Sequence, residues 1–143
     1  MNPSIYRVTV EFGDCDPARI VFYPNYCRWI DSATRHLFES YGAAWESQAK
    51  KYGITSMPLL EIHNKFLNSA TFGDEIEIES RITEIGRKTF VVQHTVRRGD
   101  TVLVEGREVR IFAIPHPEDA HRIRALLIPK DFSEVLGCSL QVV

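Results

Sequence analysis

The hydrophobic positions of this chain follow two different periods. Between Tyr6 and Phe12 every second residue is apolar and the residues between are polar, which is typical of a half-buried strand. From Pro24 the apolar residues recur at three- and four-residue steps and form one stripe, made of Tyr26, Trp29, Ile30, Ala33, Leu37 and Tyr41. The stripe predicts a long amphipathic helix of about 17 residues that stops at Gly42.

The rest of the chain is predicted to contain a short helix followed mainly by strands. The short helix is expected over Ala43 to Tyr52, with Gly53 at its end. Four strand-like segments follow Pro58, namely Leu59–Asn68, Asp74–Ile85, Thr89–Arg97 and Thr101–Ile114. A loop is expected over Pro115–Asp119, and Pro129 to Leu136 is predicted to form a short helix that begins at Pro129.

The short connections decide how the strands pair. Gly86-Arg87 and Gly99-Asp100 are tight turns, and strands joined by tight turns run antiparallel because a parallel pair needs a crossover of about a dozen residues. An antiparallel sheet of about five strands with one long helix on a single face is an α+β arrangement. The chain has 143 residues, a length that suits one domain with a substantial core, so residues 1–143 are expected to form a single domain.

Composition excludes several classes of protein. The net charge of −2 argues against a general nucleic-acid binder. The sequence contains no run of about 18 apolar residues, so no membrane span is predicted. The first residues show no basic region followed by an apolar core, so a cytoplasmic location is the expectation. The three cysteines and five histidines lack metal-ligand spacing, so no metal site is predicted, and Cys15 is interpreted as a small packed thiol.

The segment from Gly13 to Tyr26, GDCDPARIVFYPNY, carries the candidate chemistry. Asp14 and Asp16 come directly after the first strand, and Pro24-Asn25 opens the long helix. A carboxylate is therefore expected near the helix N-terminus, where backbone N–H groups lack intrahelical partners. From the residues alone, either aspartate could also simply bond backbone amides in the turn or cap a helix.

This segment resembles the signature of the 4-hydroxybenzoyl-CoA thioesterase family, a branch of the hotdog-fold acyl-CoA thioesterases. The resemblance lies in Asp14-Cys15-Asp16, Val21-Phe22-Tyr23-Pro24-Asn25-Tyr26, Arg28-Trp29-Ile30-Asp31 and Gly86-Arg87-Lys88-Thr89-Phe90. It implies a hotdog fold, with the sheet wrapped around the long helix. It also implies hydrolysis of an acyl-CoA, with an aromatic, 4-hydroxybenzoyl-like acyl group as the expected substrate.

The resemblance also implies roles for single residues. Asp16 would act as nucleophile or general base, and the backbone N–H of Tyr23 would polarise the thioester carbonyl. Asp31 would contact a hydroxyl of the acyl group across a subunit boundary, while Asp14 would hold the loop. Tyr26 and Trp29 are candidates for contact with the substrate, although aromatic residues at helical spacing are also typical of a core.

Coenzyme A is part of the substrate, so no separate cofactor is expected. Its phosphates would meet Arg87 and Lys88 on a hairpin turn, with Arg122 and Arg124 as weaker candidates. The partners are thus a small-molecule acyl-CoA and further copies of the chain, since one sheet over one helix leaves exposed edges. The family implies a site built between two subunits and a dimer of dimers.

Four alternatives stay open beside this interpretation. Aspartate-based phosphotransferases also place Asp-x-Asp after a strand, but they require a parallel sheet with alternating helices. Dehydration or hydration of an acyl thioester would require a histidine, and Gly13 to Asn25 contains none. A non-catalytic acyl-CoA sensor, or a thioesterase for short-chain aliphatic acyl groups, fits the same residues. One departure concerns specificity: Arg19 stands where this group often carries Gly, and could narrow the acyl pocket, pair with Asp14 or face solvent.

Overall fold

The computed structural model, described here for residues 3–135, contains one antiparallel sheet and one long helix. The sheet has six strands in the order β1-β3-β4-β5-β2, with β6 paired to β5. Their bounds are β1 Ser4–Thr9, β2 Leu59–Phe66, β3 Glu75–Ile85, β4 Thr89–Arg98, β5 Thr101–Pro115 and β6 Ile123–Leu126. The predicted α+β class and the antiparallel pairing are confirmed.

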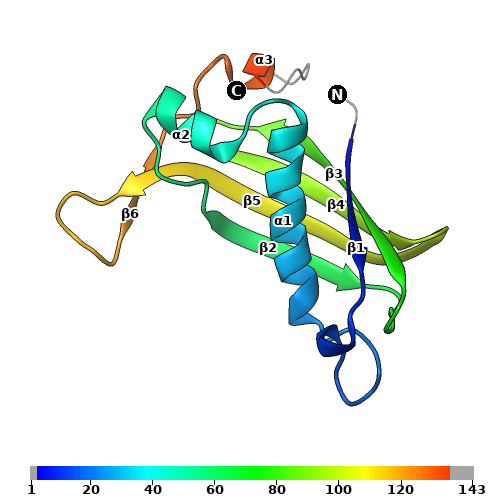
Figure 1. Ribbon diagram of the computed structural model, residues 1–143. Coiled ribbons are helices and arrows are strands. Elements are labelled where there is room, and N and C mark those ends of the chain that lie inside the picture. The colour runs from blue at the N-terminus through cyan, green and yellow to red at the C-terminus, as the bar shows by residue number, and fades with distance from the viewer. Residues whose placement is uncertain (1–2, 136–143) are drawn as a thin grey trace.

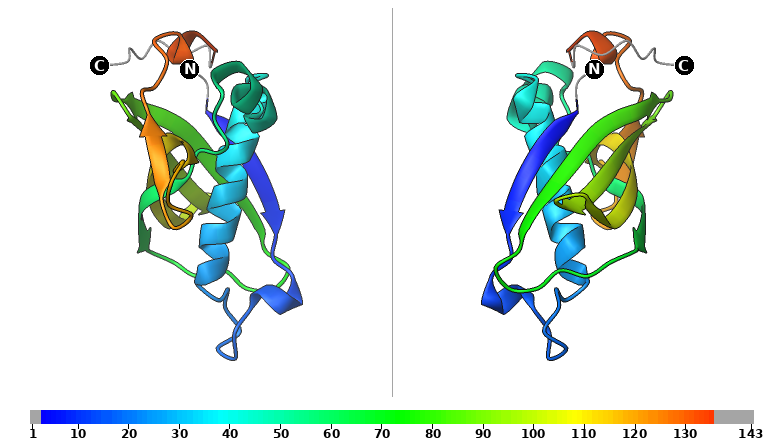
Figure 2. Two further views of the ribbon diagram at one scale, coloured as in Figure 1. Left: turned by 90° about the vertical axis from the view of Figure 1, so that its left-hand side faces the viewer. Right: turned by 90° about the vertical axis from the view of Figure 1, so that its right-hand side faces the viewer.

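Helix α1, Pro24–Ser40, lies along the concave face of the sheet, which curls around it (Figures 1 and 2). Pro24 occupies the first turn, where its missing N–H costs nothing, and Gly42 adopts a φ of 68° just beyond the end. The predicted stripe is buried from Tyr26 to Leu37, and it also includes Thr34 and Phe38. The predicted start and length of the helix are therefore confirmed.

The core beneath α1 consists of two apolar clusters with polar residues between them. On β3, Ser80 lies between Ile78 of one cluster and Ile82 of the other. On β4, His94 lies in the same way between Val92 and Val96. We call the buried polar group between the clusters the polar seam; its members are Thr34, Ser80, His94, Glu108 and Arg110.

The N-terminal strand is shorter than predicted. Strand β1 ends at Thr9, and Phe12–Asp14 forms a 3₁₀ turn in which Phe12 is 81% exposed. The alternation from Tyr6 to Phe12 therefore continues past the point where the backbone leaves the sheet. The turn is closed by the side chain of Asp14, which accepts a hydrogen bond from the amide of Glu11.

The elements after α1 also differ in detail from the predictions. Helix α2 covers Trp45–Tyr52 and ends at Gly53, as expected, whereas β6 follows the predicted loop without having been predicted. Helix α3 begins at Phe132, so the prediction of a helix start at Pro129 is wrong; Leu136 lies outside the described residues. Within residues 3–135, no helix is both long and apolar enough to cross a membrane.

Candidate active site

The loop before α1, residues 13–23, is folded back on itself at the start of the helix. Cys15 and Val21 form an isolated antiparallel bridge, and the amide of Asp16 donates to the carbonyl of Ile20 at 2.9 Å. A second bond, 2.8 Å from the Arg19 amide to the Asp16 carbonyl, closes the tip. Asp16 and Tyr23 consequently lie on the two adjacent arms of one loop.

Asp14 is the structural aspartate of the pair. Its Oδ2 accepts from the Glu11 amide at 2.8 Å and its Oδ1 from the Arg28 guanidinium at 3.1 Å. Its carbonyl oxygen accepts from the Phe22 amide and from the Asn25 side chain, which ties the loop to the first turn of α1. The prediction that Asp14 holds the loop is confirmed.

Asp16 has far fewer partners. Its Oδ1 accepts one hydrogen bond, 2.8 Å from the Ala18 amide, and no cation in residues 3–135 forms an ion pair with its carboxylate. The side chain faces a hollow of about 710 Å³ whose walls also include Phe12, Arg19, Thr71 and Phe72. A carboxylate with one bound oxygen beside an open hollow is available to react with a ligand.

Arg19 occupies the tip of the loop in a left-handed conformation with a φ of 66°. Glycine adopts such a backbone freely, whereas a residue with a Cβ is strained there. Thr71 supports the tip by donating its hydroxyl to the Arg19 carbonyl at 2.7 Å. Arg28 forms the ion pair with Asp14, whereas Arg19 lines the hollow beside Asp16 and, among the described residues, forms no ion pair with Asp14.

The Tyr23 amide, directly before the first residue of α1, is free of the hydrogen bonds that occupy its neighbours in the described part of the chain. The amides of Asn25 and Tyr26 donate to the carbonyls of Phe22 and Tyr23, and Pro24 has no N–H. Within the described part of the chain the Tyr23 amide has no hydrogen-bond acceptor. A free N–H at the positive end of a 17-residue helix is a favourable place for a developing negative charge.

The predicted aromatic residues are placed differently from one another. Tyr23 is 63% exposed and lines a second hollow of about 490 Å³ together with Tyr26 and Phe66. Tyr26 is otherwise buried, and this burial raises the pKa of its hydroxyl. Trp29, 6% exposed, packs edge-on against Tyr26 with ring centroids 5.4 Å apart, and belongs to the core. Cys15, predicted to be a small packed thiol, is partly buried against the apolar cluster that contains Tyr26 and Trp29. Cys138 lies outside the described residues.

Asp31 lies about two turns after the first residue of α1, Pro24, and its carboxylate is bound by an arginine. Its side chain is 63% exposed, and its Oδ1 accepts from Nη2 of Arg110 at 2.7 Å. The same Nη2 donates to Oε2 of Glu108 at 2.5 Å, so Arg110 connects a surface carboxylate to a buried one. Burial opposes the charge of Arg110, but its hydrogen bonds to Glu108 and Asp31 outweigh burial and raise its pKa.

The polar seam continues from Glu108 across the sheet. His94 Nε2 lies 2.8 Å from Oε1 of Glu108, and His94 Nδ1 lies 2.7 Å from the hydroxyl of Ser80. Thr34 also donates its hydroxyl to Glu108. Sequence reasoning missed this group. Its signal was the alternation in β5, where Glu108 and Arg110 occupy positions in register with the inward-facing Val104 and Phe112.

The predicted CoA-binding residues lie at the opposite end of the sheet. Arg87 and Lys88 are exposed on the turn after β3, whereas the loop before α1 lies near the beginning of that strand. The 11 residues of β3 correspond to roughly 35 Å at about 3.3 Å per residue. Within residues 3–135, Asp16 and Tyr23 lie on one loop but line two different hollows, and Arg87 and Lys88 lie at the other end of β3.

Comparison with known proteins gives a consistent result. The model of the thioesterase-like superfamily matches residues 10–136. The 4-hydroxybenzoyl-CoA thioesterase of Pseudomonas sp. (strain CBS-3) is 40% identical over 132 residues, which cover 88% of this chain and 92% of that protein. Its three-dimensional structure superposes with a TM-score of 0.84 at 35% identity, covering 94% of this chain and 99% of the other.

Two further solved structures are similar. One is a mutant 4-hydroxybenzoyl CoA thioesterase complexed with 4-hydroxybenzoyl CoA, with a TM-score of 0.85, 36% identity, and coverage of 95% of this chain and 99% of that one. The other is a gentisyl-coenzyme A thioesterase, with a TM-score of 0.75, 31% identity, and coverage of 87% and 95%. The predicted family resemblance and hotdog fold are thereby confirmed.

Proposed function

The chain belongs to the thioesterase-like superfamily, and from this premise we propose that it hydrolyses an aromatic, 4-hydroxybenzoyl-like acyl-CoA to the free acid and CoA. The observation that carries the proposal is the presence, on one loop, of a lightly bound carboxylate and an unpaired helix-terminal amide. Asp16 supplies the carboxylate and Tyr23 the amide, on adjacent arms of one loop. Residues 1–143 form one hotdog domain in this proposal.

The reaction uses the two groups in complementary roles. The Tyr23 N–H binds the thioester oxygen, and its interaction strengthens as negative charge develops there, which is the requirement for lowering the barrier. Asp16 either attacks the carbonyl carbon, expelling the CoA thiolate and leaving an anhydride that water hydrolyses, or it removes a proton from an attacking water. We favour direct attack, as in the resembling family.

The acyl group and the CoA require residues from a second subunit. Asp31, the candidate partner of an acyl hydroxyl, lies eight residues after Tyr23, or about 12 Å along α1. Arg87 and Lys88, the candidates for the CoA phosphates, lie at the far end of β3. A neighbouring copy that packs with its own helix against this one would supply what a single chain leaves distant.

The surface supports such an assembly. Strand β2 is the edge of the sheet beyond β5, and its exposed apolar side chains include Leu60 at 54% and Phe66 at 49%. Unpaired edges with apolar side chains are normally covered by another chain. We therefore propose a homo-oligomer, assembled as a dimer of dimers.

A panel of CoA esters tests the reaction and the substrate class. Thiol release would be followed with 4-hydroxybenzoyl-CoA, benzoyl-CoA, a short-chain aliphatic ester and a long-chain ester. The proposal expects the highest kcat/KM with the hydroxylated aromatic ester. Equal or higher activity with a short aliphatic ester would overturn the substrate class, and tight binding of acyl-CoA without thiol release would indicate a sensor.

Mixing two inactive variants tests the shared site. If Asp16 of one subunit works with Arg87 and Lys88 of another, Asp16→Asn and the double variant Arg87→Ala/Lys88→Ala complement one another. A mixed dimer then holds one site with every wild-type group and one site that lacks all three. Activity should reappear after subunit exchange, while two variants of the same type should stay inactive on mixing. Failure to recover activity in verified mixed dimers would refute the shared site.

A further inference from the structure

The guanidinium of Arg110 is held rigidly behind Asp31. The side chain of Arg110 is 3% exposed, and Nη1 donates to the carbonyl of Met57 at 3.0 Å while Nη2 reaches both Glu108 and Asp31. Its Cζ also lies 5.5 Å from the centroid of the Trp45 ring. With two carboxylates, one carbonyl and one aromatic ring around it, Arg110 has little freedom to move.

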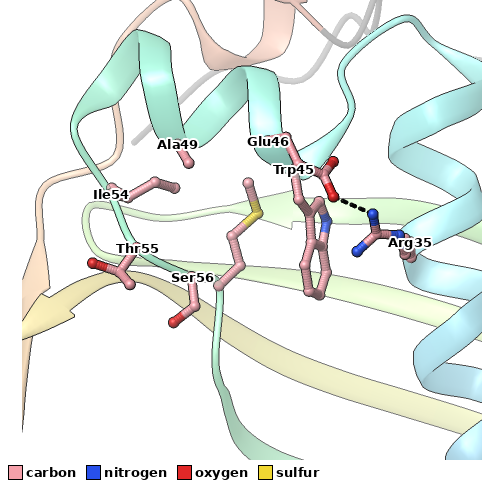
Figure 3. Close-up of a pocket in the computed structure, with 8 residues that line it drawn as sticks. Arg35, Trp45, Glu46, Ala49, Ile54, Thr55 and Ser56 are labelled. Carbon is pink, nitrogen blue, oxygen red and sulfur yellow. Dashed lines mark hydrogen bonds and ion pairs between the residues drawn. The ribbon is translucent and has the colours of Figure 1, made fainter.

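Two of these contacts come from the wall of a small hollow beside α2. The hollow has a volume of about 190 Å³, and both Trp45 and Met57 line it. Figure 3 shows the Trp45 ring beside Arg35, which forms an ion pair with Glu46. Arg110 thus links the polar seam under α1 to the segment that connects α2 with the sheet.

Fixing Arg110 also fixes Asp31 and selects one of its oxygens. Oδ1 is bound to Nη2 of Arg110, and no donor in the described part of the chain reaches Oδ2. Asp31 lies on the exposed face of α1, so Oδ2 is available to a ligand that approaches from outside the subunit. An ionised oxygen of this kind accepts a hydrogen bond and donates none.

We propose that Arg110 is a positioning residue for substrate specificity, which holds Asp31 so that its free Oδ2 accepts the hydroxyl of an aromatic acyl group. The inference rests on the proposed role of Asp31 and adds the residue that orients it. Glu108 and the seam behind it keep Arg110 in place. Since Arg110 does not touch the substrate, its loss changes the preference for the hydroxyl and leaves the chemical step intact.

The test is the ratio of kcat/KM for 4-hydroxybenzoyl-CoA to that for benzoyl-CoA. Asp31→Asn and Arg110→Lys should each lower this ratio about tenfold or more, the size expected for a hydrogen bond to a charged group. The activity of Arg110→Lys on benzoyl-CoA should stay within about twofold of wild type, which also shows that this variant is folded. The double variant should show no greater loss than the larger single loss, because both changes remove one interaction.

Arg35→Lys is the matched control, because Arg35 lies one turn from Asp31 and, within residues 3–135, forms its ion pairs with Glu39 and Glu46 and none with Asp31. It should leave the ratio unchanged. Additive losses in the double variant, or an equal loss with both substrates in Arg110→Lys, would overturn the role of Arg110. An unchanged ratio in Asp31→Asn would instead refute the proposed role of Asp31, and the inference with it.

Trp45→Leu provides a second route if Arg110→Lys yields no folded protein. It removes the ring beside the guanidinium but leaves every charge in place. The ratio should fall by a few-fold while benzoyl-CoA hydrolysis persists. A wild-type ratio in a folded Trp45→Leu protein, together with no folded Arg110→Lys, would count against Arg110 as a specificity residue.

Discussion

Two carboxylates near α1, Asp16 in the loop before the helix and Glu108 beneath its middle, meet opposite surroundings. Asp16 accepts one hydrogen bond and faces a hollow of about 710 Å³. Glu108 is 1% exposed and accepts bonds from Thr34, His94 and Arg110. The number of donors around a carboxylate thus decides whether it stays available for chemistry or becomes a fixed part of the core.

Asp14 shows that the same distinction holds within three residues. Asp14 carries the same carboxylate as Asp16, but both of its carboxylate oxygens accept hydrogen bonds, one from the Glu11 amide and one from the Arg28 guanidinium. A loop that anchors one aspartate so completely keeps the other at a defined position. The following changes separate reactive from structural carboxylates, from the largest expected effect to the smallest.

Replacing Asp16 with Asn should abolish most activity without affecting folding. The change removes the nucleophile or base, so kcat should fall by roughly 10³-fold or more, while the free energy of unfolding stays within about 0.5 kcal/mol. Thiol release and urea unfolding measure the two quantities. Asp14→Asn is the matched control and should show the reverse balance: a loss of stability with a smaller loss of kcat. Near-wild-type turnover of Asp16→Asn would refute the assignment.

Replacing Glu108 with Gln should act on stability. It leaves the buried Arg110 guanidinium without its inner carboxylate, and removing one partner of a buried pair costs about 3 kcal/mol or more. Urea unfolding at fixed protein concentration measures the loss. Glu105→Gln is the control, since Glu105 is exposed on the same strand and should change the free energy of unfolding only slightly. Equal losses in the two variants would show that the seam does not stabilise the fold.

The sequence predicts those parts of the fold that depend on residues close together in the chain. Pro24 and the change of period mark the start of α1, and the two tight turns fix the antiparallel pairing. Strand β6 could not be predicted, because four residues are too few to show a clear period and they form a strand through pairing with Ala113 and its neighbours.

The candidate site was predicted in part for the same reason. Asp16 and Tyr23 belong to one short segment, so the sequence alone places them on one loop, whereas the pairing of Asp31 with Arg110 joins residues 79 positions apart. The polar seam depends on the register of three strands beneath one helix. Period-two alternation places Glu108 and Arg110 on the inner face, but it does not say which partners they meet there.

The pH dependence of stability should reveal the ionised state of Glu108. Burial raises the pKa of this carboxyl, but the hydrogen bonds from His94 and Arg110 outweigh burial and hold it below the ordinary 4.5. As the pH falls, Glu108 is therefore protonated in the unfolded chain before it is protonated in the folded protein. The contribution of ionised Glu108 to the free energy of unfolding is complete above pH 4.5 and is lost as the pH falls below it. Between these two pKa values the slope is at most about 1.4 kcal/mol per pH unit.

Unfolding measured from pH 6 to pH 3 checks this contribution. In Glu108→Gln the decline below pH 4.5 should be shallower than in wild type, whereas Glu105→Gln should keep the wild-type slope. Parallel curves for wild type and Glu108→Gln would contradict an ionised Glu108 with a lowered pKa.

Replacing Arg19 with Gly should produce the smallest effect and the opposite sign, a gain of stability. Arg19 holds a φ of 66°, which costs a residue with a Cβ about 1 kcal/mol, and Gly removes that cost at the expense of some entropy in the unfolded chain. A net gain of about 0.5 kcal/mol is expected, or a rise in Tm of about 1–2 °C for a domain of this size. Arg19→Ala is the control, because it removes the guanidinium but keeps the strain. Both variants empty the same side of the hollow beside Asp16, so any change in kcat/KM should be shared, while only Arg19→Gly should be stabilised. Equal Tm values for the Gly and Ala variants would show that the loop carries no strain at this position.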